Sequence, residues 1–85
     1  MIIRFSDKAK KQTQKLPRHI QEKLRKQLLY LLVNPRHPSL RVKKMQGLDA
    51  FEARIDYQYR FAFETDGEAI HLLAVGPHDA GLGKK

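Results

Sequence analysis

Three short runs of alternating apolar residues occupy the second half of the chain and constrain its fold more than any other feature. The runs are Phe51, Ala53 and Ile55, then Tyr59, Phe61 and Phe63, and finally Ile70, Leu72 and Ala74. A period of two is that of a β-strand, because successive side chains point to opposite faces of a sheet. The sequence therefore predicts an antiparallel sheet with one apolar face.

Turn length predicts how the last two strands pair. Asp66-Gly67 is typical of a two-residue hairpin turn. If it is the whole loop, Phe63 lies opposite Ile70 and Phe61 lies opposite Leu72. A slip of one residue would move every apolar side chain to the other face, so we expect this register to be strongly specified.

The preceding turn predicts a pair of arginines. It needs an odd number of residues to keep all three runs on one face, and Asp56–Gln58 is the simplest choice. Arg54 then lies directly opposite Arg60, which is destabilising, so something should offset the repulsion. One explanation is a cluster of ion pairs with Glu52 or Asp56. The other is a bound phosphate, which two guanidinium groups hold well.

The first half of the chain begins with a strand and a helix. Ile2–Phe5 is predicted to be a short strand, and Ser6 is a suitable N-cap for a helix over residues 7–16. Three lysines share a stripe of this helix at helical spacing: Lys8, Lys11 and Lys15. Such a stripe is a candidate surface for a polyanion or for an acidic protein partner.

A second helix follows Pro17, which ends the first one. Its apolar residues recur on one helical face: Ile20, Leu24, Leu28, Leu31 and Leu32. Asn34-Pro35 ends this helix, and Leu40–Met45 is a further candidate strand. The fold class is therefore α+β in a single domain over residues 1–85. We expect an N-terminal strand and then a two-helix hairpin that packs on one face of a mostly antiparallel, twisted sheet of about four to five strands.

Charge is divided unevenly along the 85 residues. Residues 1–45 hold 13 Lys and Arg residues and two acids, a balance of +11, whereas residues 46–85 have a balance of −3. The basic half suggests a polyanion or an acidic protein as partner, and the alternative is a solvated helical surface.

Composition excludes several classes of site. The absence of cysteine excludes disulfides and thiolate chemistry, and the four histidines have no clustered spacing for a metal. No run of apolar residues is long enough to span a membrane, so we expect a soluble, intracellular protein without a metal or cofactor.

A histidine beside an acid follows the last strand, in Gly76-Pro77-His78-Asp79. His78 is well placed there for proton transfer, although most loop histidines are ordinary surface residues. Lys43 and Lys44 are consecutive residues of the candidate strand, so their side chains point to opposite faces and at most one of them points toward Arg54 and Arg60. The alternative is that they protect a sheet edge.

Four segments in this order resemble toxins of the RelE/ParE superfamily, from type II toxin–antitoxin systems. The segments are residues 37–47, Phe51–Ile55, Tyr59–Phe63 and Val75–Asp79. The last is similar to the end of the YafQ-like branch, and the resemblance covers nearly the whole chain. It implies a cytoplasmic prokaryotic toxin that cuts mRNA on the ribosome without a metal. It also implies an acidic, partly disordered antitoxin, through which alone the toxin would meet operator DNA.

The resemblance also implies roles for particular residues. Arg54 and Arg60 would stabilise the charged phosphorane formed when a ribose 2′-OH attacks the adjacent phosphate. His78 would act as general acid or base, and Lys43 falls near a position that can hold a basic residue. The substrate-binding set would comprise Arg41, Lys44, Asp79 and Leu82. The lysine stripe of the first helix (Lys8, Lys11 and Lys15) would bind ribosomal RNA or the antitoxin. Leu82 departs from the family, which often has an aromatic residue there that stacks on a base.

Two other functions stay open at this point. In the first, a protein with the same fold poisons gyrase. This activity is associated with the ParE branch and needs no nuclease chemistry. The other is a degenerate, nontoxic homologue that only binds an antitoxin and helps to repress its own operon.

Overall fold

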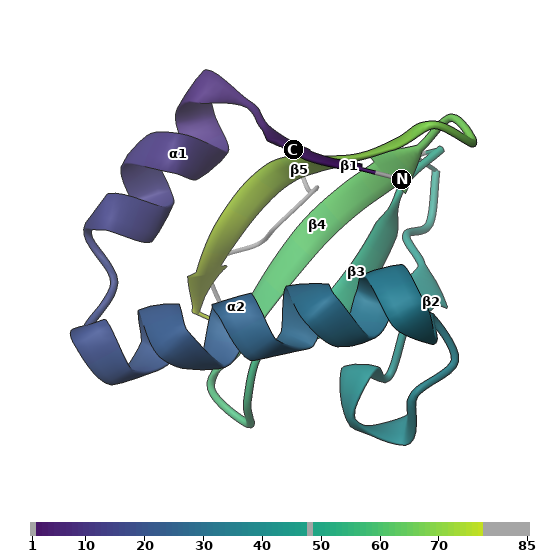
Figure 1. Ribbon diagram of the computed structural model, residues 1–85. Coiled ribbons are helices and arrows are strands. Elements are labelled where there is room, and N and C mark those ends of the chain that lie inside the picture. Colours follow the sequence, from purple (N-terminus) through teal and green to yellow (C-terminus); the bar gives the residue numbers. More distant parts are fainter. Residues whose placement is uncertain (1, 48, 78–85) are drawn as a thin grey trace.

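A five-stranded sheet with two helices on one face forms the part of the chain that this computed structural model describes, residues 2–47 and 49–77 (Figure 1). Its elements are β1 (Ile2–Phe5), α1 (Asp7–Gln14), α2 (Arg18–Val33), a 3-10 turn (Pro38–Leu40), β2 (Lys43–Lys44), β3 (Phe51–Arg54), β4 (Tyr59–Thr65) and β5 (Ala69–Pro77). The strands lie in the order β1-β5-β4-β3-β2. β1 runs parallel to β5 and all other neighbours are antiparallel, which confirms the predicted α+β class.

Local signals in the sequence set the ends of both helices. Ser6 Oγ accepts a hydrogen bond from the N–H of Ala9 at 3.0 Å and so caps α1. α1 ends at Gln14, two residues earlier than predicted, and Pro17 is the N-cap of α2. α2 ends at Val33 because Pro35 disfavours a helical conformation at Asn34.

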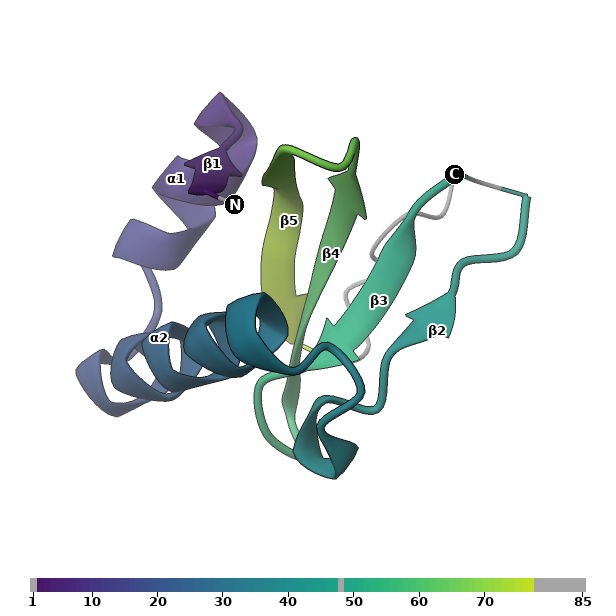
Figure 2. The ribbon, with the colours of Figure 1, turned by 45° about the vertical axis from the view of Figure 1, so that its right-hand side comes forward.

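The core lies between the helices and one face of the sheet. Figure 2 shows α1 and α2 on the same side of the sheet, with β2 at the edge farthest from α1. The largest fully buried side chains of the core are Phe61, Ile20, Leu24, Leu40, Leu72 and Val75. The other face of the sheet, which we call the helix-free face, carries the side chains that alternate with the core residues.

The predicted strand over Leu40–Met45 is wrong in most of its length. His37 Nδ1 accepts the N–H of Ser39, which caps a 3-10 turn that ends at Leu40. Arg41 then adopts a left-handed conformation with φ of 47°, which interrupts any extended strand. Only Lys43 and Lys44 remain to form β2.

The predicted register of the last hairpin is also wrong. Phe63 lies opposite Leu72, and an irregularity next to it places Phe61 opposite Val75. Asp66 Oδ1 accepts the N–H groups of Glu68 and Ala69, so the loop is longer than two residues.

The irregularity is a bulge at Leu73 in β5, where one extra residue intervenes between two pairs of partners. The bulge lies against the start of α1, because Ser6 donates its N–H to the carbonyl of Leu72 and its hydroxyl to that of Leu73. These bonds join the first helix to the last strand.

Candidate functional site

Arg54 and Arg60 lie directly opposite each other on β3 and β4, as the turn length predicted. Their neighbours Ala53 and Phe61 are fully buried in the core, so both arginines project from the helix-free face. Arg60 Nη1 donates to the carbonyl of Asp56 at 2.9 Å, which directs this side chain toward the β3–β4 connection.

Arg54 has a hydrogen-bond donor that is left unused. Its Nε is shielded from solvent and has no hydrogen-bond partner among the residues that the structure describes. Partial burial lowers the pKa of Arg54, and the positive charges of Arg41 and then Arg60 lower it further, whereas Asp56 opposes the shift. We call Arg41, Arg54 and Arg60 the arginine cluster. Both features would be relieved by an anion that accepts hydrogen bonds.

Ion pairing with neighbouring acids does not account for the arginine pair. Glu52 is held by Lys43 at 3.6 Å and Asp56 by Lys23 at 3.5 Å. Among residues 2–47 and 49–77, no carboxylate lies within 4 Å of either arginine side chain. Of the two explanations offered by the sequence, the direct ion-pair cluster is therefore wrong.

Asp56 stays ionised in this arrangement. Burial alone would raise its pKa, but hydrogen bonds from the N–H groups of Gln58 and Tyr59, together with the Lys23 ammonium group, lower the pKa below its ordinary value. The carboxylate of Asp56 is thus already bound by N–H groups of its own loop and by Lys23 of α2.

The two lysines of β2 lie on opposite faces. Lys43 is opposite Glu52 and shares the helix-free face with Arg54, whereas Lys44 is opposite Phe51 on the face that carries the helices. Arg41 lies close enough to Arg54 to affect its pKa. The structure thus brings Arg41, Arg54 and Arg60 together, with Lys43 on the same face and Lys44 apart from them.

The remaining predicted residues lie elsewhere. Lys8, Lys11 and Lys15 are exposed on α1 and at its end. The helix α1 itself lies beside β5 and β1 (Figure 1). His78, Asp79 and Leu82 lie outside the described residues.

A pocket that lies beside Arg54 was not predicted from the sequence. It has a volume of about 360 Å³ between α2, the 3-10 turn and the β3–β4 connection. We call it the Tyr57 pocket, after the exposed tyrosine at its rim. The other residues that line it are Lys23, Lys26, Gln27, Tyr30, His37, Ser39, Arg54, Ile55 and Asp56.

Gln27 joins these three elements and is 6 % exposed. Its Nε2 donates to the carbonyls of Arg54 at 2.8 Å and Ser39 at 3.2 Å, and its Oε1 accepts from Ser39 Oγ at 3.2 Å. A signal was present in the sequence, because Gln27 falls between Leu24 and Leu31 at helical spacing on the apolar face of α2.

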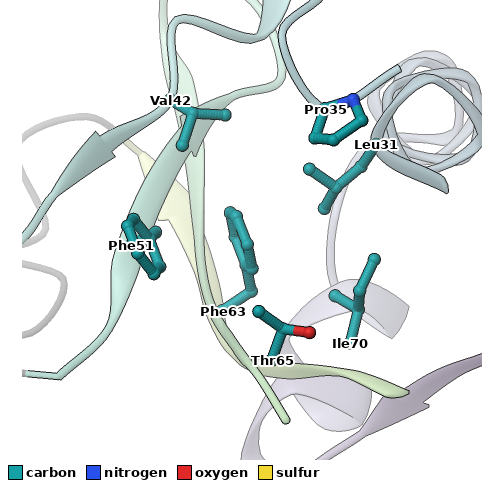
Figure 3. Close-up of a pocket in the computed structure, with 7 residues that line it drawn as sticks. All are labelled: Leu31, Pro35, Val42, Phe51, Phe63, Thr65 and Ile70. Atoms are coloured by element: carbon teal, nitrogen blue, oxygen red, sulfur yellow. The ribbon is translucent and has the colours of Figure 1, made fainter. Parts of the chain in front are cut away.

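An apolar groove of about 250 Å³ lies on the helix-covered side, between the end of α2 and strands β3, β4 and β5. Figure 3 shows side chains from α2, its following loop and the sheet directed into a common space. They are Leu31, Pro35, Val42, Phe51, Phe63, Thr65 and Ile70.

Other kinds of site find no support in the described ranges. No cluster of three His, Asp or Glu residues that could hold a metal occurs in residues 2–47 and 49–77. Neither described helix is long and apolar enough to cross a membrane.

Comparison with known families gives one clear match. A sequence model of the family described as "ParE toxin of type II toxin-antitoxin system, parDE" matches residues 3–80. This chain belongs to the ParE toxin family. The predicted membership of the RelE/ParE superfamily is therefore confirmed. A search of curated proteins finds no match.

Solved structures of toxins share this family's fold. The intact RelBE toxin-antitoxin complex of E. coli contains a chain that is 25 % identical, with a TM-score of 0.71 over 88 % of this chain and 93 % of that one. YafQ from E. coli is 14 % identical, with a TM-score of 0.78 and coverage of 92 % and 93 %. The YoeB/ParE toxin of Agrobacterium tumefaciens is also 14 % identical, with a TM-score of 0.77 and coverage of 92 % and 99 %.

Proposed function

We propose that this ParE-family toxin is a ribosome-dependent endoribonuclease that cuts mRNA and so inhibits translation. The observation that carries the proposal is the arginine cluster: within residues 2–47 and 49–77, neither Arg54 nor Arg60 pairs with an acid, and Arg54 Nε has no hydrogen-bond partner. Two adjacent guanidinium groups suit a phosphate with two negative oxygens in its transition state.

The chemistry is assigned to side chains of the chain itself. The ribose 2′-OH attacks the adjacent phosphorus while the bond to the 5′-oxygen breaks, which leaves a cyclic phosphate and a 5′-hydroxyl end. Arg54 and Arg60 stabilise the charge that develops on the phosphorane. His78 protonates the leaving oxygen or accepts the proton of the 2′-OH. Lys43 can also stabilise the charge on the phosphorane once its ion pair with Glu52 is broken.

Lysines far from the arginine cluster are assigned to the larger partners. Lys8, Lys11 and Lys15 contact ribosomal RNA or the antitoxin, and binding to ribosomal RNA should weaken steeply with salt. The proposed antitoxin is acidic and folds on binding, which suits a chain whose net charge is +8. The apolar groove offers it buried contact area, and operator DNA is reached only through it. Such a toxin works in the cytoplasm of a prokaryote.

Arg60→Ala tests the nuclease proposal, with Arg25→Ala on the exposed side of α2 as the matched control. Both variants and the wild type are added to translating ribosomes, and the 5′ ends of the mRNA are mapped. We expect new 5′ ends with wild type and with Arg25→Ala, and a fall of about 10²- to 10³-fold in cleavage with Arg60→Ala. Unchanged cleavage by Arg60→Ala would remove this arginine from the active site.

A gyrase poison is the second candidate, favoured by the match to the ParE family model. Intact mRNA on translating ribosomes together with a DNA-damage response in cells would support it against the nuclease. Normal growth on induction without an antitoxin would instead indicate a nontoxic protein that only binds the antitoxin.

A further inference from the structure

The Tyr57 pocket has the size and the position of a ligand site. Its volume of about 360 Å³ falls within the range of roughly 300–1,000 Å³ that is usual for small-molecule pockets. It adjoins the arginine cluster, since Arg54 lines it and the Asp56 carbonyl that binds Arg60 belongs to the same connection. A ligand in this pocket would therefore lie next to a phosphate held by Arg54 and Arg60.

Aromatic rings line this pocket. Tyr30 and His37 stack with their ring centroids 3.9 Å apart and their planes within 9°. Tyr57 is 74 % exposed at the rim, where no core packing accounts for it. Exposed aromatic rings beside cationic groups are the usual platform for unpaired nucleic-acid bases.

The charged groups of the pocket fit a nucleotide. Lys26 Nζ lies 5.9 Å from the Tyr30 ring centroid, and Arg54 borders the pocket on the sheet side. The one acid, Asp56, is already neutralised by Lys23 and bound by backbone N–H groups. Free positive charge thus remains for the phosphates on either side of a base.

The polar wall of the pocket is held in place and still offers a ring nitrogen for hydrogen bonding. Gln27 is fully occupied by Ser39 and Arg54, so the wall is held by hydrogen bonds across three elements. His37 Nδ1 lies 3.2 Å from the backbone nitrogen of Ser39 and 2.9 Å from its Oγ, so Nε2 is the ring nitrogen that remains for a ligand. Nε2 of an imidazole can form a hydrogen bond with the polar edge of a base.

We propose that the Tyr57 pocket is a nucleobase subsite for single-stranded RNA, in which the nucleotide next to the phosphate at Arg54 and Arg60 stacks on Tyr57. The inference rests on the proposed function, because it names where the substrate's base lies at that site. Tyr57 is then a determinant of which position in an RNA is presented for cleavage.

Binding of a ten-nucleotide RNA tests the subsite without requiring cleavage. The probe is an oligouridylate with one central 2-aminopurine and 2′-O-methyl groups that prevent attack by the 2′-oxygen. Affinity is measured by anisotropy and stacking by quenching of the 2-aminopurine fluorescence. The variants are Tyr57→Leu, Tyr57→Phe and Arg60→Ala, with Phe5→Leu as a matched aromatic control at the far edge of the sheet.

We expect Tyr57→Leu to weaken binding by about 5- to 150-fold and to abolish quenching. Tyr57→Phe should restore both, and Phe5→Leu should behave as wild type. Arg60→Ala should weaken binding but leave the quenching at saturation unchanged, because it contacts phosphate and not the base. Unfolding curves check that each variant is folded.

The outcomes separate this inference from the proposed function. Quenching that depends on Tyr57, without cleavage of ribosomal mRNA, would support the subsite and contradict the nuclease. Equal affinity and equal quenching for Tyr57→Leu and wild type would overturn the subsite, as would wild-type protein that does not bind the probe at low salt. Ribosomal cleavage would then still decide the nuclease proposal by itself.

Discussion

The two faces of the sheet differ in what their side chains do, although they belong to the same strands. Phe61 is fully buried under the helices, and its neighbour Arg60 projects from the helix-free face toward Arg54. The first face gains from removing apolar surface from water. The second holds like charges together, and no carboxylate of the described residues forms an ion pair with them. Two consecutive residues of β4 therefore have different roles: Phe61 contributes to stability, and Arg60 belongs to the candidate functional site.

This contrast has a physical consequence for the proposed active site. Adjacent charges of one sign are held in place only because the rest of the fold is stable enough to tolerate their repulsion. The arginine cluster is thus poised for an anion before the anion arrives, which is the usual requirement for electrostatic stabilisation of a transition state.

The largest expected effect comes from the helix-covered face. Phe61→Ala removes a ring with no exposed surface, and we expect a loss of about 3–5 kcal/mol in the free energy of unfolding. Urea unfolding followed by circular dichroism measures it. Arg60→Ala, one residue away, is the control and should change stability far less. Equal losses for the two variants would contradict the division between the faces.

Gln27→Leu tests the connection between the two faces. It leaves the carbonyls of Arg54 and Ser39 without their buried donor, which we expect to cost about 1–3 kcal/mol in the free energy of unfolding. RNA binding should fall as well at a temperature where the variant is fully folded, because the backbone of Arg54 is no longer fixed to α2. Gln14→Leu, at an exposed position of α1, is the matched control.

Arg54→Met should move stability and binding in opposite directions. Removing the charge relieves repulsion by Arg41 and Arg60, so the urea midpoint should rise slightly. Loss of one phosphate contact should lower the slope of log affinity against log salt by about 0.7 for single-stranded RNA. Arg25→Met provides the control for both measurements. A lower urea midpoint would show that Arg54 stabilises the empty fold.

The smallest expected effect is a change in how stability depends on pH, caused by Asp66 in the β4–β5 loop. N–H groups of Glu68 and Ala69, with His71, hold the pKa of Asp66 at about 2. A lowered pKa adds stability that is present above the unfolded value of about 4 and is lost as pH falls toward 2. Asp66→Asn should therefore flatten the fall in thermal midpoint between about pH 4 and pH 2, whereas Glu64→Gln should not.

Much of the contrast between the faces could be read from short-range patterns. Alternation in β3 and β4 and the length of their connection predicted that Arg54 lies opposite Arg60, because side-chain direction in a strand changes at every residue. The bounds of α2 followed from Pro17 and Pro35 for equally local reasons.

The errors arose where side chains bind the backbone across short loops. The carboxylate of Asp66 lengthens the hairpin loop, and the ring of His37 closes the 3-10 turn that replaces most of the predicted strand. Several conformations of such loops compete within small energy differences, so the tertiary contacts of Leu40 and Ser6 select among them.

The sequence by itself determined the fold class, the helix-hairpin and the pairing of Arg54 with Arg60, since these depend on periodicity and turn length. Only the tertiary structure decided that the acids beside the arginines are held by lysines, that Arg41 joins them, and that Gln27 fixes a pocket beside them. Those features depend on distances between α2, the 3-10 turn and β3, and no periodic pattern in a single segment records such distances.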